Sequence, residues 1–266
     1  MQNNKKLWIL VLVIVVATIG TSIVSFQTQG QDKTSLTNTN QKDSSKLEQK
    51  RKEFDSQFQT AQYDAPEEAD PEKKTKRKLK NKRYDNRGGL VSNDMPVDEG
   101  EERMLITHSD SIAGLPASES EIVVVGEVLD AQAYVSNNKK GVYSEFTVRV
   151  NEILKNNSTN VAKGSLISVD REGGFVEYKN GKTRLHRIGG QGMPRVGQRY
   201  VLFLKNPEKS PNYEIITGYE LKADGVANLN GDEQFRAYAG MDEAAFMKAV
   251  RQAIAQSSPA VPEKEE

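Results

Sequence analysis

The sequence predicts a mainly β-sheet domain that follows an apolar N-terminal segment and a long charged segment. From residue 119 onward, short apolar or alternating runs recur with turn-forming residues between them, as in small barrels and sandwiches. Residues 7–26 carry no charge, whereas residues 27–118 are rich in polar and charged side chains and poor in large apolar ones. We therefore expect six or seven strands within residues 119–232 and no packed core before them.

The overall composition argues against several functions. The chain carries 37 acidic and 37 basic residues among 266, and a net charge of zero gives no general attraction to nucleic acid. The absence of cysteine excludes disulfide bonds, thiolate nucleophiles and cysteine-ligated metals.

Residues 7–26 predict a transmembrane signal-anchor helix, because about twenty helical residues span the roughly 30 Å hydrocarbon core of a bilayer. Lys5 and Lys6 precede this segment and the next charge is Asp32, so residues 1–6 are expected in the cytoplasm and the rest outside, in the periplasm. A cleaved signal peptide, which would give a secreted protein, is the alternative. Gly20 and Ser22 suit it, but an A-x-A-like site is absent. A buried helix of a soluble protein rarely runs this long without a charge.

Residues 27–118 predict a low-complexity charged tether with transient helices. Leu47, Phe54 and Phe58 form a weak helical stripe, and residues 71–85 predict a second helix with Pro71 and Glu72 in its first turn.

Eight basic residues crowd the second of these helices. Such a block is usually a solvated segment, and contact with anionic lipid headgroups or envelope polyanions is the functional alternative. Nucleic acid is not an expected partner, because the anchor places the block outside the cytoplasm. The residues are Lys73, Lys74, Lys76, Arg77, Lys78, Lys80, Lys82 and Arg83.

The strands of the predicted domain follow from periodicity. Residues 122–129 form an apolar run that Gly126 interrupts, which favours a bulge. Residues 143–154 alternate, with Phe146 on the apolar face and Glu145 on the polar face. Residues 165–170, 199–205, 212–221 and 226–229 supply further strands, and 199–205 is apolar on both faces. Residues 241–257 predict an amphipathic helix packed on the barrel, and residues 258–266 a disordered tail.

Residues 174–188 predict a β-hairpin whose Asn180-Gly181 pair favours a type I′ turn. That turn would place Glu177 opposite Arg184 and Phe175 opposite His186.

At this point a resemblance emerges. The succession VVVGEV, EFTVRVNEILK, a glycine-rich loop, VGQRYVLFL and YEIITGYEL resembles bacterial relatives of the netrin-like module, an OB-type barrel also found in tissue inhibitors of metalloproteinases. The resemblance covers residues 119–232 and implies an OB-like, five-stranded Greek-key barrel with an added hairpin, on a secreted or anchored protein. The N-terminal cysteine and the disulfides of the animal inhibitors are absent, so their way of blocking a protease zinc does not transfer.

Catalytic motifs are missing from the sequence. His108 and His186 have no second ligand at helical spacing, and there is no G-x-S-x-G elbow or Walker A loop, so we predict no enzyme activity, no cofactor and no metal. OB barrels bind linear ligands through basic, aromatic-bearing faces. A solvated hairpin is the ordinary alternative for the candidate ligand-binding set, which comprises Phe175, Tyr178, Lys182, Arg184, Arg187, Arg195 and Arg199.

Together these features predict a membrane-anchored binding module of the cell envelope, whose partner is another envelope protein or a polyanion. The alternative is a periplasmic hydrolase or a protease-inhibitor-like protein without a recognisable catalytic motif.

We expect the N-terminal segment to remain on the mature protein, because it lacks an A-x-A-like peptidase site. N-terminal sequencing of the protein purified from membranes tests this. A mature chain that starts near residue 23 would show cleavage and secretion instead.

Overall fold

The computed structural model describes residues 56–85, 87, 102–105, 112–157, 161–207, 210 and 212–257. For residues 102–105 it describes the backbone. The predicted cytoplasmic N-terminus, the anchor at 7–26 and the tail at 258–266 all lie outside these ranges. Within the ranges, every helix is too short or too polar to cross a membrane.

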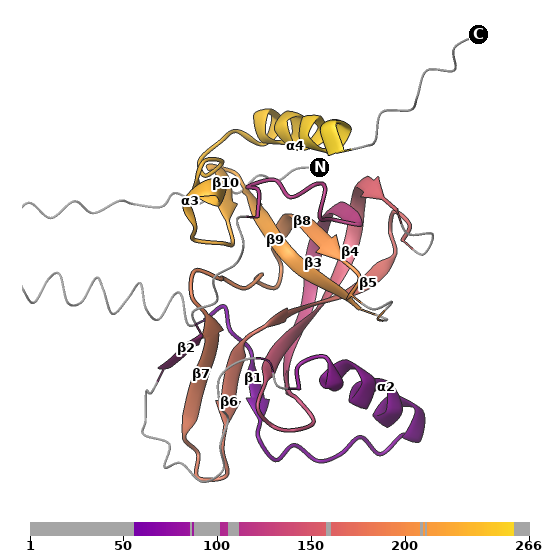
Figure 1. Ribbon diagram of the computed structural model, residues 1–266, viewed down its shortest axis with the longest axis vertical. Coiled ribbons are helices and arrows are strands. Elements are labelled where there is room, and N and C mark those ends of the chain that lie inside the picture. Colours follow the sequence, from indigo (N-terminus) through magenta and orange to yellow (C-terminus); the bar gives the residue numbers. More distant parts are fainter. Residues whose placement is uncertain are drawn as a thin grey trace, which may run out of the picture. The chain divides into compact units, whose positions relative to one another are not determined.

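The described part of the chain is mainly β-sheet (Figure 1). The early elements are β1 (Thr60–Gln62), α2 (Pro71–Lys82) and β2 (Glu102–Leu105). The strands of the predicted domain are β3 (Ile122–Val135), β4 (Val142–Asn156), β5 (Leu166–Glu172), β6 (Gly174–Glu177), β7 (Thr183–Ile188), β8 (Arg199–Lys205), β9 (Tyr213–Lys222) and β10 (Gly225–Asn228). Two helices follow, α3 (Glu233–Arg236) and α4 (Glu243–Ser257).

The strands form two sheets. The smaller has the order β1-β6-β7-β2, and the larger the order β10-β9-β5-β4-β3-β8 with an additional pairing of β9 with β8. Through that pairing, five strands follow one another in a closed circuit, β3-β4-β5-β9-β8 and back to β3, which we call the strand ring. All pairings in the ring are antiparallel except that of β5 with β9, which is parallel.

Alternation along the ring strands divides the apolar residues between two cores. On β3, Val124 belongs to the first core and Val125 to the second. On β8, Leu202 belongs to the first core and Phe203 to the second. Successive side chains of a strand point to opposite faces, so these strands are buried on both sides. This explains why residues 199–205 are apolar at every position but their ends.

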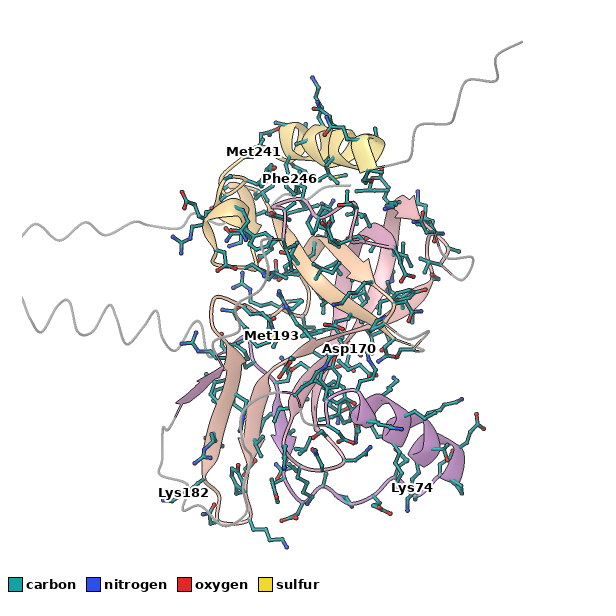
Figure 2. The ribbon with its side chains drawn as sticks, in the orientation of Figure 1. Lys74, Asp170, Lys182, Met193, Met241 and Phe246 are labelled. Carbon is teal, nitrogen blue, oxygen red and sulfur yellow. The ribbon has the colours of Figure 1, made fainter. Side chains whose placement is uncertain are left out.

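The second core is covered by α4, as the sequence predicts. Phe246 and Val250 are fully buried, and Ile254 packs against the same cluster. Figure 2 labels Phe246 of this helix and Met241, which precedes it. The helix begins where Asp242 accepts hydrogen bonds from the backbone N–H groups of Ala244 and Ala245, at 2.9 and 3.3 Å.

The predicted irregularity at Gly126 is confirmed. The β3–β4 register shifts between Val125 and Gly126. A Cβ atom at Gly126 would lie 2.4 Å from Cγ1 of Val148, so glycine is required for the strands to approach this closely.

The predicted hairpin exists, but its predicted turn type is wrong. Gly181 has a φ of +77°, whereas Asn180 does not have the positive φ that a type I′ turn requires. One additional residue therefore enters the loop and the register moves by one position. Glu177 pairs with Thr183 and His186 with Gly174, and Arg184 faces Val176 instead of Glu177.

A tether over residues 27–118 is contradicted for its described residues between 56 and 85. β1 pairs in parallel with β6, and Phe58 packs in the first core with its ring 6.4 Å from that of Phe175. The helix predicted at 71–85 is present as α2, which ends at Lys82; it is capped by Asp70 and contacts the strand ring. The backbone of β2 pairs with β7. Charge composition failed as a guide here because acidic partners supplied by distant strands make ordering of this segment favourable.

A buried arginine holds the glycine-rich loop before β8. Arg171 of β5 is 1% exposed and donates hydrogen bonds to the carbonyl oxygens of Gly192 and Ile216, at 2.6 and 3.3 Å. Burial lowers the pKa of its guanidinium to about 9. The loop connects β7 with β8.

Candidate functional site

Among the described residues, a dense group of charges lies on the outer face of the strand ring. Glu145 on β4 pairs in register with Asp170 on β5, and Asp170 pairs with Glu214 on β9. The three carboxylates therefore lie side by side across three neighbouring strands, and we call them the carboxylate row. Like charges placed directly opposite one another destabilise a sheet unless they are neutralised.

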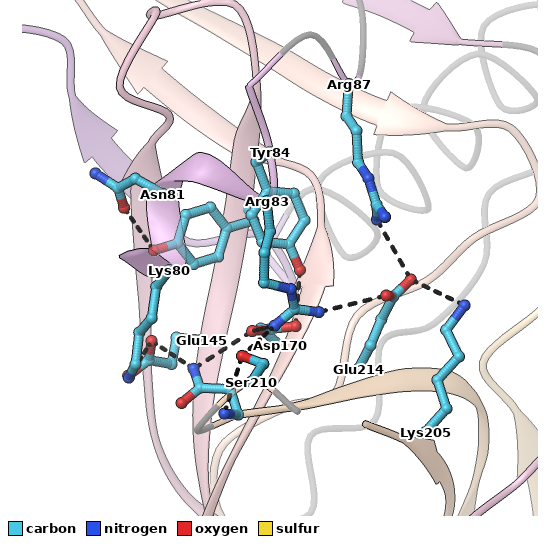
Figure 3. A network of polar contacts seen from close by, with 12 residues as sticks. Lys80, Asn81, Arg83, Tyr84, Arg87, Glu145, Asp170, Lys205, Ser210 and Glu214 are labelled. Carbon is cyan, nitrogen blue, oxygen red and sulfur yellow. Dashed lines mark hydrogen bonds and ion pairs between the residues drawn. The ribbon is translucent and has the colours of Figure 1, made fainter. Parts of the chain in front are cut away.

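The neutralising charges come mainly from α2 and the residues after it (Figure 3). Lys80 lies 3.0 Å from Glu145, and Arg77 donates to the same carboxylate at 3.0 Å. Arg83 bridges Asp170 at 3.0 Å and Glu214 at 3.4 Å. Glu214 also faces Arg87 at 3.6 Å and Lys205 at 3.4 Å.

The spacing of these basic residues follows from the helix. Arg77, Lys80 and Arg83 are three residues apart, so one face of the helical segment presents all three to the sheet. The remaining basic residues of the block are turned away from the row. Lys74 pairs with Glu67 and Lys76 with Glu72, and exposed side chains belong to Lys73, Lys76, Lys78 and Lys82.

A stack of tyrosine rings lies beside the row. The rings of Tyr84 and Tyr143 are 4.1 Å apart and nearly parallel, and both residues are almost fully buried. The hydroxyl of Tyr84 donates to Asp170 at 2.7 Å, and that of Tyr143 donates to Asn81 at 2.7 Å. Arg77 lies over the ring of Tyr134 at 3.5 Å, a cation–π contact.

Two loops of the strand ring complete the contact with the segment 71–87. In the β3–β4 loop, Asn137 donates to the carbonyl oxygen of Lys78, and the N–H of Asn138 donates to Asp85, both at 2.9 Å. A Cβ atom at Gly141 would lie 2.2 Å from the carbonyl oxygen of Tyr84, so the two backbones touch there. In the β8–β9 loop, Ser210 accepts a hydrogen bond from Arg83 at 3.1 Å, and Asn212 donates to Glu145 of β4 at 2.9 Å.

Burial and the neighbouring positive charges shift the pKa values of Glu145 and Asp170 in opposite directions. Burial raises the pKa of Asp170 to about 6, although Arg83 and hydrogen bonds from Tyr84 and Asn212 favour its ionised form. Burial alone would also raise the pKa of Glu145, but Lys80 and Arg77 together lower it below its ordinary value. Burial raises the pKa of Tyr84 well above its ordinary range, so this phenol remains a donor.

The candidate ligand-binding set predicted from the hairpin is dispersed over both sheets. Phe175, Tyr178, Lys182, Arg184 and Arg187 belong to the β6–β7 hairpin of the smaller sheet. Phe175 packs on the first core, Tyr178 stacks on Tyr63, and Arg184 is 1% exposed.

The last two members of that set are paired within the larger sheet and its helix. Arg195 donates to Glu220 of β9 at 2.8 Å, and Arg199 to Glu243 of α4 at 3.2 Å. His186 lies in the hairpin and is buried, whereas His108 lies outside the described residues.

Sequence reasoning did not find the carboxylate row. Alternation correctly placed Glu145 on the polar face of its strand. Only the parallel pairing of β5 with β9 brings Glu214 beside Asp170, and that pairing has no signal in the local sequence. Within the described ranges, no three His, Asp or Glu side chains are grouped so that they could hold a metal ion.

Comparison with known proteins adds no name to this site. No model of a known protein family matches the chain, and a search of curated proteins finds no similar sequence.

We expect Arg83→Met to destabilise the protein by about 3–5 kcal/mol, because it leaves the fully buried Asp170 without its ionic partner. The matched control is Lys82→Met on the exposed face of the same helix, which should cost less than about 0.5 kcal/mol. Chemical denaturation of both variants measures the difference. Equal stabilities would show that the buried pair does not hold the segment.

The titration of Asp170 should weaken the fold as the pH rises. Its folded pKa of about 6 lies above its ordinary value of 3.8, so the folded state holds the proton more tightly. By linkage, wild-type stability relative to Asp170→Asn should fall between about pH 4 and 6, by up to about 3 kcal/mol at roughly 1.4 kcal/mol per pH unit. Denaturation at several pH values and NMR titration of the Asp170 carboxyl carbon measure this. A midpoint at or below 3.8 would contradict it.

Proposed function

We propose that the protein is a single-pass, membrane-anchored binding module of the cell envelope, and that its strand ring is an OB-type barrel on the outer side of the membrane. The order of pairing supports the barrel, because in an OB fold five strands close on themselves in a Greek key. The anchor and its orientation rest on residues 7–26 and the two lysines before them. Membership of the netrin-like group remains part of this proposal.

The proposed binding function rests on one observation, namely which parts of the strand ring contact the segment 71–87. OB folds bind their ligands on the face of the second and third strands, between the first–second and fourth–fifth loops. Here those parts are β4, β5, the β3–β4 loop and the β8–β9 loop. Each of them contacts the segment 71–87, through Glu145, Asp170, Asn137 and Ser210 respectively. The face therefore has the geometry and the polar groups of a recognition surface.

The chemistry of this face suits binding better than catalysis. Asp170 is 0% exposed and accepts three hydrogen bonds, so its carboxylate is directed at protein groups and away from solvent. Glu145 accepts from Arg77, Lys80 and Asn212 in the same way. Carboxylates held by protein donors in this manner are suited to positioning a partner segment.

A site-specific photo-crosslinking amino acid tests the binding function in the full-length protein in native membranes. We expect a discrete adduct with a second protein from position 137, an exposed residue of the β3–β4 loop at the edge of the face, and none from position 248, an exposed residue on α4. Glu145→Lys places a positive charge in the carboxylate row and should abolish the adduct.

Adducts of equal yield at the two positions, or an adduct that Glu145→Lys leaves unchanged, would reject this face as the binding surface.

A further inference from the structure

We infer that the partner bound by this face is a cationic helical segment containing arginine, and that the chain's own segment 71–87 occupies the face until such a partner replaces it. This inference rests on the binding function proposed above and names the class of ligand and the regulation of that face. The evidence for it is the set of contacts that the segment 71–87, which we call the resident segment, makes with the face.

The face selects positive charge. The carboxylate row gathers three acids on neighbouring strands, and their described ionic partners are all lysines or arginines. The helix α2 itself buries no residue, so burial of apolar surface contributes little to its docking. Tyr84, just after the helix, is the deeply buried anchor of the segment. A ligand therefore needs charge along one face and an aromatic ring at one end.

Two positions favour arginine over lysine. Arg77 stacks on Tyr134 while its guanidinium also donates to Tyr143 at 3.1 Å and to Glu145 at 3.0 Å. Arg83 divides its donors among Asp170, Glu214 and Ser210. A planar guanidinium can stack and donate in several directions together, whereas a lysine ammonium is a compact point charge. Lys80, which contacts Glu145 alone, has no such requirement.

The ligand must also be helical. Arg77, Lys80 and Arg83 reach the row together only because helical spacing aligns them, and the helix is started by Asp70, which accepts from the N–H of Glu72 at 2.9 Å. A disordered basic tract of the same charge would lose backbone conformational entropy on binding to the face, so it would bind more weakly.

The resident segment has a concentration advantage over a competitor that is dilute in solution. A segment on the same chain acts at an effective concentration of about millimolar when its linker is short. Its docking depends mainly on ion pairs, so salt weakens it as the Debye length shrinks. A partner segment held close by in the membrane can compete with it, whereas a dilute basic peptide cannot.

The test uses the full-length protein and a synthetic peptide of residues 69–88 bearing a fluorophore. In one variant, Arg77, Lys80 and Arg83 are all changed to Gln, which removes the resident charges without adding acidic ones. Fluorescence anisotropy should show the peptide binding this triple variant at least tenfold more tightly than the wild type. Adding Glu145→Lys to the triple variant should remove the binding.

A second peptide carries Arg77→Lys and Arg83→Lys and keeps the same net charge. We expect it to bind the triple variant at least tenfold more weakly than the native peptide. Equal binding of the two peptides would mean unspecific attraction and would overturn the inference. Absence of peptide binding to a folded triple variant, verified by circular dichroism and cooperative unfolding, would also overturn it.

If the triple variant does not fold, the double variant Arg77→Gln and Lys80→Gln, which keeps Arg83 and Tyr84, replaces it with the same criteria. The crosslinking experiment distinguishes the two proposals. A face-specific adduct without peptide binding would reject the ligand class and leave the binding module intact. Peptide binding without an adduct would reject the proposal that this face binds a partner in the membrane. The preference of the face for a cationic, arginine-containing helix would still stand.

Discussion

The carboxylate row is the constraint on which the arrangement of the described N-terminal part depends. Glu145, Asp170 and Glu214 are neighbours across β4, β5 and β9, and the middle one is fully buried. Three adjacent carboxylates cannot remain ionised out of water unless cations lie against them. The strand ring therefore requires a basic partner on this face, and α2 with the residues after it provides one. Of the eight basic residues at 73–83, Arg77, Lys80 and Arg83 are the counterpart of this row.

Two different kinds of contact hold the two long helices. The helix α4 covers the second core through Phe246, Met247 and Val250, so its docking is apolar and largely indifferent to pH and salt. The helix α2 buries no side chain and docks through ion pairs, hydrogen bonds and the Tyr84 ring that follows it. One helix is thus a permanent part of the core, while the other is held by interactions that solution conditions and charged competitors can change.

The same alternation that builds the core also builds the recognition face. On β4, Phe146 points into the first core while its neighbour Glu145 points outward to Lys80. On β5, Val169 and Asp170 divide in the same way, with Val169 in the core and Asp170 against Arg83. A shift of either strand by one residue would bury the acids in the core and expose the apolar residues. Packing of the core therefore fixes the strand register, and the register fixes the position of each carboxylate in the row.

Local sequence patterns determined the secondary structure of the domain to a large extent. β-branched runs, the alternation around Glu145, the interruption at Gly126 and the stripe of Phe246, Val250 and Ile254 each depend on neighbours within a few residues, and each is found as expected. The hairpin at residues 174–188 is also found. Its register is not as expected, because turn type depends on the φ angle of Asn180, which the Asn-Gly pair favours but does not dictate.

Only the tertiary structure decided what the charged residues do. The block at 73–83 has the composition of a solvated segment, and nothing near it in the chain contradicts that reading. Its partners Glu145, Asp170 and Glu214 lie more than sixty residues away, on three strands that the parallel β5–β9 pairing brings together. Charge attraction acts through space and not along the chain, so composition alone described a tether where the fold has an ordered helical segment that Arg77, Lys80 and Arg83 hold against the sheet.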